Sequence, residues 1–293
     1  MASAKAYRFT PRAVLRFTGE DHFDFLQGQG TADLRGPAGT CRYSLWLDHR
    51  GQIQGDGFVF RESEESMLLV SHATPVENLL AKFERHIIAD DVEIENLTGE
   101  FDILALTGED ANSLLQSMGW DPVESGRYAE KDTISAYAGR YFGTRSVEFL
   151  LPTGSDLSVP ADSIDPDEAE ALRIHAGIPS VPLDTSTKEL NPLEANILSA
   201  LSFDKGCYLG QEVVARVHRL DRVTRRLVQF ETSGNRASLP DNWVLEDNIV
   251  GAPTSVVENP DKCIGIGWLK SRCEDGQWTF GETTFLVQSL PAS

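Results

Sequence analysis

The sequence predicts an α+β protein with two related α+β units and a small closed all-β module at its C-terminus. Three observations predict this class. One strand–turn–helix pattern occurs twice, short β-type runs fill the C-terminal part, and 41% hydrophobic residues in a chain of 293 allow several packed cores. The repeated pattern is "TGEDHFDFLQGQG" at residues 18–30 and "TGEDANSLLQSMG" at residues 107–119. In both copies, acidic residues lie where a helix would begin. The first turn of a helix has free backbone N–H groups, which favour negative charge nearby.

The first unit is expected over residues 1–98. The strand "AVLRF" precedes the first copy of the pattern, and "GFVF" and "MLLV" indicate two strands joined by a polar turn. Residues 74–77, Thr-Pro-Val-Glu, predict a capping box with proline at the first helical position. The helix that follows places six apolar residues on one face: Val76, Leu79, Leu80, Phe83, Ile87 and Ile88. "VEIENL" predicts the strand after this helix.

The second unit is expected over residues 99–222. It begins with the strand "ILAL" and the second copy of the pattern, and residues 152–168 form a loop that leads to a helix beginning near Pro166. From residue 223 to residue 293 the pattern changes to short β-type runs such as "TRRLVQF" and "CIGIGWL", separated by turn residues. This change predicts a small β-barrel.

The charge of the chain limits its partners. A net charge of −19 argues against a broad nucleic-acid-binding face, because neutralising phosphates needs concentrated Lys and Arg. No run of 18 apolar residues predicts a membrane span, and the first ten residues lack the apolar stretch of a signal peptide. We expect a cytoplasmic monomer. One basic segment stands out, which is either a solvated strand edge or a site for a small anion: Lys205, Arg216, Arg219, Arg222, Arg225 and Arg226.

The cysteines indicate neither zinc nor disulfides. Cys41, Cys207, Cys263 and Cys273 are scattered, without a C-x-x-C pair or a His-rich partner segment, and no bound metal is predicted. Cys207 differs from the others because it lies between two glycines in "KGCYLGQE", residues 205–212. Such a turn either has a structural role and carries an unreactive thiol, or it exposes a reactive thiol to solvent.

The neighbours of Cys207 allow the same two interpretations. Lys205 would favour the thiolate, and Gln211 and Glu212 would accept hydrogen bonds from a heterocycle, or would cap and bridge neighbouring strands. Tyr208 either packs beside the turn or walls a flat ligand.

The motif "SFDKGCYLGQEVVAR" resembles the signature of the YgfZ-type folate-binding proteins, which are relatives of the glycine-cleavage T-protein (aminomethyltransferase). The resemblance covers nearly the whole chain, because further matching segments occur in the expected order: "FLQGQGTAD", "GQIQGDGFVF", "LRIHAGIP", "NPLEANI" and "CIGIGWL". It implies that the two units and the barrel surround a central channel for tetrahydrofolate. Arginines of the basic segment, Arg216 among them, would then pair with the glutamate tail of folate.

The resemblance leaves two functions open. A T-protein-like enzyme needs a carboxylate beside the reacting nitrogens of folate, but the T-protein's adjacent pair of acids corresponds here to Gly55 and Asp56. Its pterin-binding glutamate corresponds to His175, and a histidine is not a permanent acceptor. Asp56 is otherwise a turn acid, and His175 an ordinary interior or surface histidine.

The other function is that of a folate-binding accessory factor. YgfZ-type proteins support the maturation of iron–sulfur enzymes, including ones that modify tRNA. The resemblance therefore implies iron–sulfur clients or assembly proteins as partners, and Cys207 as the functional thiol or a transient ligand. One cysteine cannot hold a cluster by itself. We favour this second function over aminomethyl transfer.

Overall fold

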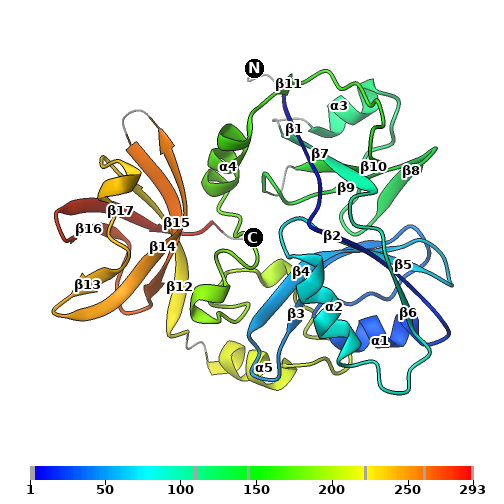
Figure 1. Cartoon of the computed structure of the whole chain (residues 1–293), viewed down its shortest axis with the longest axis horizontal. Coiled ribbons are helices and arrows are strands. Elements are labelled where there is room, and N and C mark those ends of the chain that lie inside the picture. The colour runs from blue at the N-terminus through cyan, green and yellow to red at the C-terminus, as the bar shows by residue number, and fades with distance from the viewer. Residues whose placement is uncertain (1–3, 108–110, 144–145, 221–222, 260–261, 292–293) are drawn as a thin grey trace.

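The computed structural model describes residues 4–107, 111–143, 146–220, 223–259 and 262–291. Three β-sheets organise the chain: two lie one above the other and the third forms a separate lobe beside them (Figure 1). The α+β prediction with a C-terminal barrel is confirmed. The predicted domain boundaries, after residues 98 and 222, stay a prediction.

The first sheet has five antiparallel strands in the order β3-β4-β5-β2-β6. Their bounds are β2 Ala13–Thr18, β3 Cys41–Leu47, β4 Ile53–Arg61, β5 Met67–Ser71 and β6 Glu93–Asn96. The helices α1 (His22–Gln29) and α2 (Val76–Glu84) cover one face of it. Leu26 of α1, Phe83 of α2 and Trp46 of β3 belong to the core between sheet and helices.

The second sheet has six strands in the order β11-β1-β7-β10-β9-β8. Their bounds are β1 Lys5–Phe9, β7 Phe101–Thr107, β8 Tyr128–Lys131, β9 Ile134–Ala138, β10 Val147–Pro152 and β11 Asp162–Ser163. Its helices are α3 (Ala111–Ser117) and α4 (Pro166–His175). β1 therefore lies beside β7 in the second sheet, although its residues fall within the predicted first unit, 1–98.

The two sheets pack face to face. Phe58 and Phe60 of β4 share a buried cluster with Ile103 of β7 and Tyr137 of β9. The rings of Phe60 and Tyr137 meet edge to face at 5.0 Å between centroids. The duplicated units are thus joined through alternating inward residues of both sheets, as in a sandwich.

The third sheet is a nearly closed barrel with the order β13-β14-β15-β12-β17-β16. Its strands are β12 Arg225–Thr232, β13 Trp243–Leu245, β14 Asn248–Asn259, β15 Lys262–Lys270, β16 Gly276–Phe280 and β17 Thr283–Ser289. The edge strands approach each other where Trp243 of β13 stacks on Phe280 of β16, at 5.3 Å between centroids.

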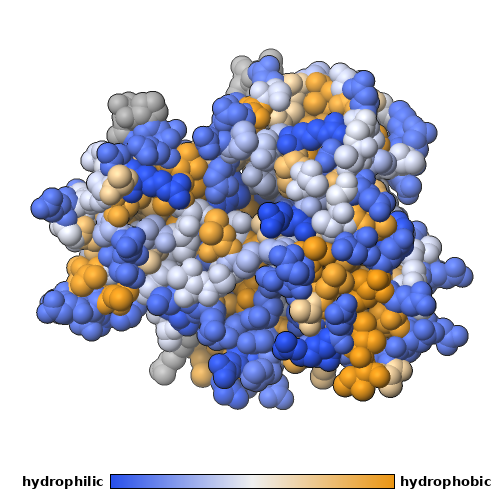
Figure 2. All heavy atoms as spheres, viewed as in Figure 1, coloured by the Kyte–Doolittle hydropathy of each residue, from blue (hydrophilic) through white to orange (hydrophobic). Residues whose placement is uncertain are grey.

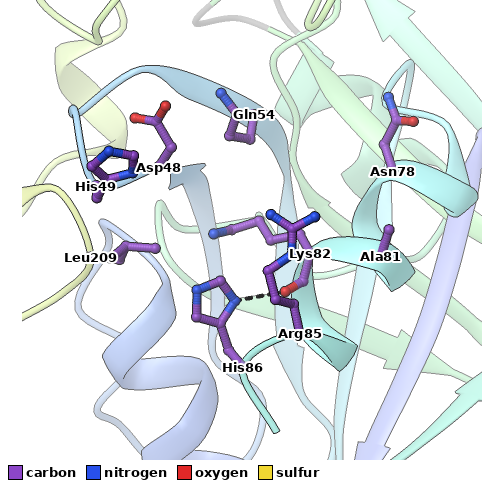
Figure 3. Close-up of a pocket in the computed structure, with 9 residues that line it drawn as sticks. All are labelled: Asp48, His49, Gln54, Asn78, Ala81, Lys82, Arg85, His86 and Leu209. Carbon is purple, nitrogen blue, oxygen red and sulfur yellow. Dashed lines mark hydrogen bonds between the residues drawn. The ribbon is translucent and has the colours of Figure 1, made fainter.

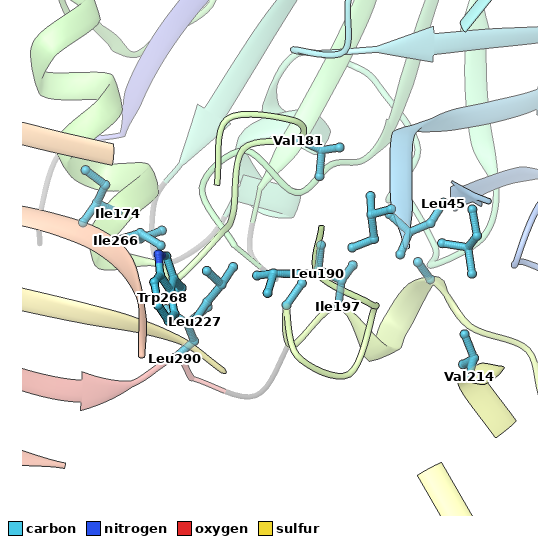
Figure 4. Packing of buried hydrophobic residues seen from close by; sticks show 14 of the residues in the cluster. Leu45, Ile174, Val181, Leu190, Ile197, Val214, Leu227, Ile266, Trp268 and Leu290 are labelled. Atoms are coloured by element: carbon cyan, nitrogen blue, oxygen red, sulfur yellow. The ribbon is translucent and has the colours of Figure 1, made fainter. Parts of the chain in front are cut away.

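The described residues of the segment 176–224 contain no strand, and they fill the space between the three sheets. They include the short 3₁₀ turns Ser186–Lys188 and Leu198–Ala200, and the helix α5 (Gln211–Leu220); a third 3₁₀ turn, Arg236–Ser238, lies in the barrel. Leu190 and Ile197 of this segment share one core with Leu45 of β3 and Trp268 of β15 (Figure 4). The segment therefore ties the barrel to the first sheet.

Two expectations about helices need correction. The capping box at residue 74 is wrong: the Thr74 hydroxyl donates to the Asp56 carboxylate at 2.8 Å, and α2 starts at Val76 without a side-chain cap. A buried carboxylate binds the hydroxyl more strongly than a solvated helix end does. Residues 211–220 form the helix α5, which the sequence pattern does not predict.

Several further expectations are settled or left open by the fold. The helix near Pro166 is confirmed, since Asp165 caps α4 by accepting from the Glu168 N–H at 2.8 Å. The acidic start of the second repeat, residues 108–110, lies outside the described residues. Across the described part of the chain, no helix has the length and apolar character needed to cross a membrane. The cytoplasmic location and the monomeric state stay predictions.

Candidate functional site

A central cavity of about 750 Å³ lies where the two stacked sheets meet the segment 176–224. β3 and β4 supply Tyr43 and Phe58, and the turn between β9 and β10 supplies Arg140. The other lining residues are Ala32, Asp33, Cys41, Arg42, Ser125, Gly126, Ala138, Gly139, Gly143, Ile178 and residues 199–202. Aromatic walls with a few convergent polar groups, at this volume, are typical of small-molecule sites.

Asp56 lies on the cavity-facing side of β4, directly behind Tyr43. The Tyr43 hydroxyl donates to Asp56 Oδ2 at 2.7 Å, and Arg140 Nη1 lies 3.6 Å from the same oxygen. The Arg140 guanidinium also lies over the Tyr43 ring, 4.2 Å from its centroid. Burial raises the pKa of Tyr43 well above 10, so the phenol stays protonated and remains a donor.

The second oxygen of Asp56 is held from the other side. Ser71 and Thr74 donate to Oδ1 at 3.1 and 2.8 Å. Asp56 is only 4% exposed, and both of its oxygens accept hydrogen bonds from the protein. The groups that face the cavity are therefore the Tyr43 ring and the Arg140 guanidinium, with Asp56 as their anchor.

A second buried carboxylate positions Arg140. Glu148 of β10 accepts from the backbone N–H groups of Arg140 and Tyr141, both at 2.8 Å, and from the Tyr137 hydroxyl at 2.8 Å. His72 Nε2 lies 2.9 Å from Glu148 Oε2. Burial by itself would raise the pKa of Glu148, but His72 and these hydrogen bonds hold it at about 2. An ionised Glu148 thus fixes the turn that carries Arg140.

Cys207 is exposed on the loop before α5. This agrees with the interpretation that the flanking glycines allow the thiol to be exposed. Gly210, with φ +85°, presses this loop onto the turn between β3 and β4, because a Cβ there would lie 2.5 Å from the Asp48 carbonyl oxygen. Gly206 has open space around it. Cys207 is not among the residues that line the central cavity.

Lys205 is buried and fastens the start of this loop to the end of α1. Its ammonium donates to the carbonyls of Gln27, Gly30 and Ala32 at 2.5, 2.7 and 2.9 Å. Burial lowers the pKa of Lys205 to about 8. Its three donors are thereby used on backbone oxygens, and activation of Cys207 by Lys205 stays a prediction.

The other motif residues lie around α5. Tyr208 is buried in the common core, and Gln211 Oε1 accepts from the Tyr208 N–H at 3.4 Å. Glu212 and Arg216 are exposed on the helix surface, and neither lines the central cavity. Tyr208 therefore packs beside the turn in the core. Contacts between folate and Tyr208, Gln211, Glu212 or Arg216 stay predictions.

His175 lies apart from Asp56. It ends α4 and lines a hollow of about 80 Å³ against the barrel, together with Gln229 and Phe230. Arg173, two residues earlier in α4, is buried, and it pairs with Asp184 at 3.2 Å and with Glu170 at 2.5 Å. The structure does not bring His175 to the central cavity.

The basic segment does not gather into one patch. Arg225 lies 3.5 Å from Glu194, and Arg226 lies 2.8 Å from Asp275 of the barrel. Arg222 falls outside the described residues. The arginines that do enter the cavity are Arg42 and Arg140, which the sequence analysis missed because their approach depends on the pairing of distant strands.

Comparison with known proteins finds relatives of more than one kind. The mitochondrial iron–sulfur cluster assembly factor IBA57 homolog of Cryptococcus neoformans is 26% identical over 78% of this chain and 66% of its own length. The tRNA-modifying protein YgfZ of Yersinia enterocolitica is 26% identical, with 83% and 78% covered. The aminomethyltransferase of Thermoanaerobacter pseudethanolicus is 24% identical, with 87% and 75% covered.

The fold has a close counterpart among solved structures. The glycine cleavage system aminomethyltransferase T from Bartonella henselae matches with a TM-score of 0.79 at 20% identity, over 100% of this chain and 87% of that chain. Residues 10–130 match the sequence model of the GCVT N-terminal domain. The chain is thus similar to the GcvT/aminomethyltransferase family over this range, and it matches YgfZ, IBA57 and aminomethyltransferase relatives at nearly the same identity.

Proposed function

We propose that the central cavity binds tetrahydrofolate and that the protein serves iron–sulfur enzymes through Cys207, as a factor of the YgfZ and IBA57 kind. The observation that supports folate most directly is the lining of the cavity. Tyr43 and Phe58 offer flat walls for a pterin, and Arg42 and Arg140 offer guanidinium groups for carboxylates. The volume of about 750 Å³ is in the range of small-molecule and cofactor sites.

Cys207 is the feature that favours an accessory factor. Of the four cysteines, all of them within the described residues, it is the exposed one. Among the described residues, no group of three or more His, Cys, Asp or Glu side chains could hold a metal ion. A cluster served by Cys207 would therefore be cargo, with its remaining ligands supplied by a client or assembly protein.

Aminomethyl transfer is the second candidate, and the fold shared with aminomethyltransferase T favours it. The site gives it less support. At Gly55, where the T-protein pattern has an acid, a Cβ would lie 2.8 Å from Leu79 Cδ2 and 3.0 Å from Thr74 Cγ2, on the helix-covered side of the sheet. Asp56, the remaining acid, has both oxygens committed to hydrogen bonds with the protein. No turnover is expected with an aminomethyl donor and tetrahydrofolate in a direct assay.

Calorimetric titration tests folate binding. We expect tetrahydrofolate to bind with a dissociation constant in the micromolar range or tighter, and Arg140→Ala to weaken it about tenfold through loss of a charge-assisted contact. The matched control is Arg272→Ala, which removes an exposed arginine of the barrel. Absence of heat at millimolar folate, or equal affinity in Arg140→Ala, would contradict the proposed site.

Complementation tests the role of the thiol. In cells that lack their own copy, we expect Cys207→Ala to accumulate as folded protein but to leave iron–sulfur enzyme activity unrestored. Cys273→Ala is a control at a buried cysteine, scored after matching the amount of folded protein. Full restoration by Cys207→Ala would show that the thiol is dispensable.

A further inference from the structure

A second pocket, of about 530 Å³, shares no lining residue with the central cavity. It lies between α2, the turn that joins β3 to β4, and the loop that carries Cys207 (Figure 3). Its lining residues are Asp48, His49, Gln54, Asn78, Ala81, Lys82, Arg85, His86 and Leu209. Leu209 places the pocket two residues along the chain from Cys207.

Positive charge in this pocket exceeds negative charge. Lys82 and Arg85, one turn apart on and beyond the end of α2, lie next to each other in the pocket, with His86 beside them and His49 across it (Figure 3). Asp48 is the one carboxylate in the lining, and its Oδ1 already accepts from the N–H groups of Arg50 and Gln52, at 2.8 and 2.9 Å.

Neither cation forms an ion pair with a described residue. Lys82 donates to the Leu47 carbonyl at 2.8 Å, which leaves two of its hydrogens for another acceptor. Burial lowers the pKa of Lys82 to about 8; Asp48 raises it and Arg85 lowers it further. The positive charges of Lys82 and Arg85 repel each other, because no carboxylate of the described residues forms an ion pair with either of them. Such a pair of cations is unexpected in a chain of net charge −19. An anion between them would relieve this repulsion.

The neutral groups of the lining suit the same kind of ligand. His86 Nδ1 lies 2.7 Å from the Lys82 carbonyl oxygen, so this nitrogen carries a hydrogen and the other ring nitrogen is left for the pocket. The side-chain amides of Gln54 and Asn78 add neutral donors at the rim (Figure 3). The volume exceeds that of a single oxyanion, which leaves room for a ligand body against Ala81 and Leu209.

We propose that this pocket binds a small molecule that bears an oxyanion, a phosphate or a carboxylate, with Lys82 and Arg85 as its charge partners. The site stands independently of folate binding in the central cavity. Because the Cys207 loop forms one of its walls, an occupied pocket would place an anionic ligand beside the surface from which the thiol is displayed.

Titration calorimetry with inorganic pyrophosphate in one arm and citrate in the other tests the proposal and separates the two oxyanion chemistries. At least one probe is expected to bind with a submillimolar dissociation constant. Lys82→Gln and Arg85→Gln should each weaken that binding about tenfold, the loss expected for one charge-assisted contact. Arg272→Gln, which removes a positive charge from the barrel surface, should leave it unchanged.

The pH dependence gives a readout that a structural role of Lys82 would not produce. Between pH 7 and pH 9 the wild type should lose affinity severalfold as Lys82 loses its proton, while Lys82→Arg should hold its affinity across this range. The other charged or titratable groups that face Lys82 are Asp48, His49, Arg85 and His86. Failure of both probes to bind at millimolar concentration would overturn the proposal. So would equal affinity in the wild type and in an Arg85→Gln variant that keeps the wild-type Tm.

Discussion

The thiol of Cys207 is the residue on which the accessory role depends. Cys41, Cys263 and Cys273 are buried, and burial raises the pKa of Cys41 and Cys263, which further lowers their reactivity. We therefore expect one thiol to react rapidly with a thiol reagent in the native protein, and all four after denaturation. The measurement is a stopped-flow titration with a chromogenic disulfide. Rapid reaction of one equivalent in Cys207→Ser would show that another cysteine is accessible.

At this scale the sequence predicted some residues of the site and missed others. Turn glycines singled out Cys207, which is exposed, and the family resemblance singled out Asp56, which is buried behind Tyr43; the roles of both residues stay predictions. Tyr43 and Arg140 lie 13 residues before and 84 residues after Asp56, and only the packing of two sheets brings them together. His175, which was also predicted to contact folate, lies at the end of α4 against the barrel, and its contact with folate stays a prediction.

We expect the loop that carries Cys207 to depend on Gly210 and to tolerate substitution at Gly206. Gly210→Ala would force a left-handed backbone on alanine and a clash with the Asp48 carbonyl, so we expect a loss of about 1–3 kcal/mol. Gly206→Ala is the matched control, because nothing lies within 4 Å of its added Cβ; it should change stability by less than about 0.5 kcal/mol. Urea unfolding of both variants measures the difference. Equal stability of the two would show that the loop does not dock on the β3–β4 turn.

The turn between β9 and β10 should respond to acid through Glu148. Its pKa of about 2 lies below the value of about 4.3 for an unfolded glutamate, so the unfolded state binds more protons between these values. The contribution of ionised Glu148 to the free energy of unfolding is therefore fully present above about pH 5 and is lost as the pH falls toward 2. Glu148→Gln should be less stable than the wild type at neutral pH by about 1–3 kcal/mol. This difference in the free energy of unfolding should become smaller in acid. Urea unfolding across this range checks it, and a difference independent of pH would contradict it.

Elements were predictable where local signals were strong. The repeated strand–helix pattern, the start of α4 near Pro166 and the barrel strands all follow short-range rules of periodicity and turns. α5 was missed because its glycine-flanked motif and three valines indicate a turn and a strand, whereas burial of Val214 in the common core stabilises a helix. The Thr74 hydroxyl was assigned to a cap because the sequence could not show the buried acid beside it.

At the scale of the whole molecule, a shared core joins the barrel to the first sheet. Trp268 and Leu227 of the barrel meet Leu45 of β3 through Leu190 of the intervening segment (Figure 4). Trp268→Ala should cost about 3–5 kcal/mol. Because the core is shared, calorimetry should show one unfolding transition that moves as a unit. Separate transitions, with only one shifted by the substitution, would show that the barrel folds independently.

The surface of the molecule agrees with its acidic composition, since hydrophilic side chains cover much of the face seen in Figure 2. Two pockets contain the cationic side chains on which the proposed ligands depend. Arg42 and Arg140 line the central cavity, and Lys82 and Arg85 line the second pocket. Composition predicted that nucleic acid is an unsuitable partner for such a surface. It could not predict the pockets, because each of them forms from segments far apart in the chain.

The most direct test of the account is a crystal structure of the protein soaked with a stable reduced folate. The account predicts ligand density in the central cavity, with the pterin against Tyr43 and Phe58 and at least one carboxylate on an arginine of the same cavity. Density beside His175 at the barrel, or an empty central cavity at saturating folate, would contradict it.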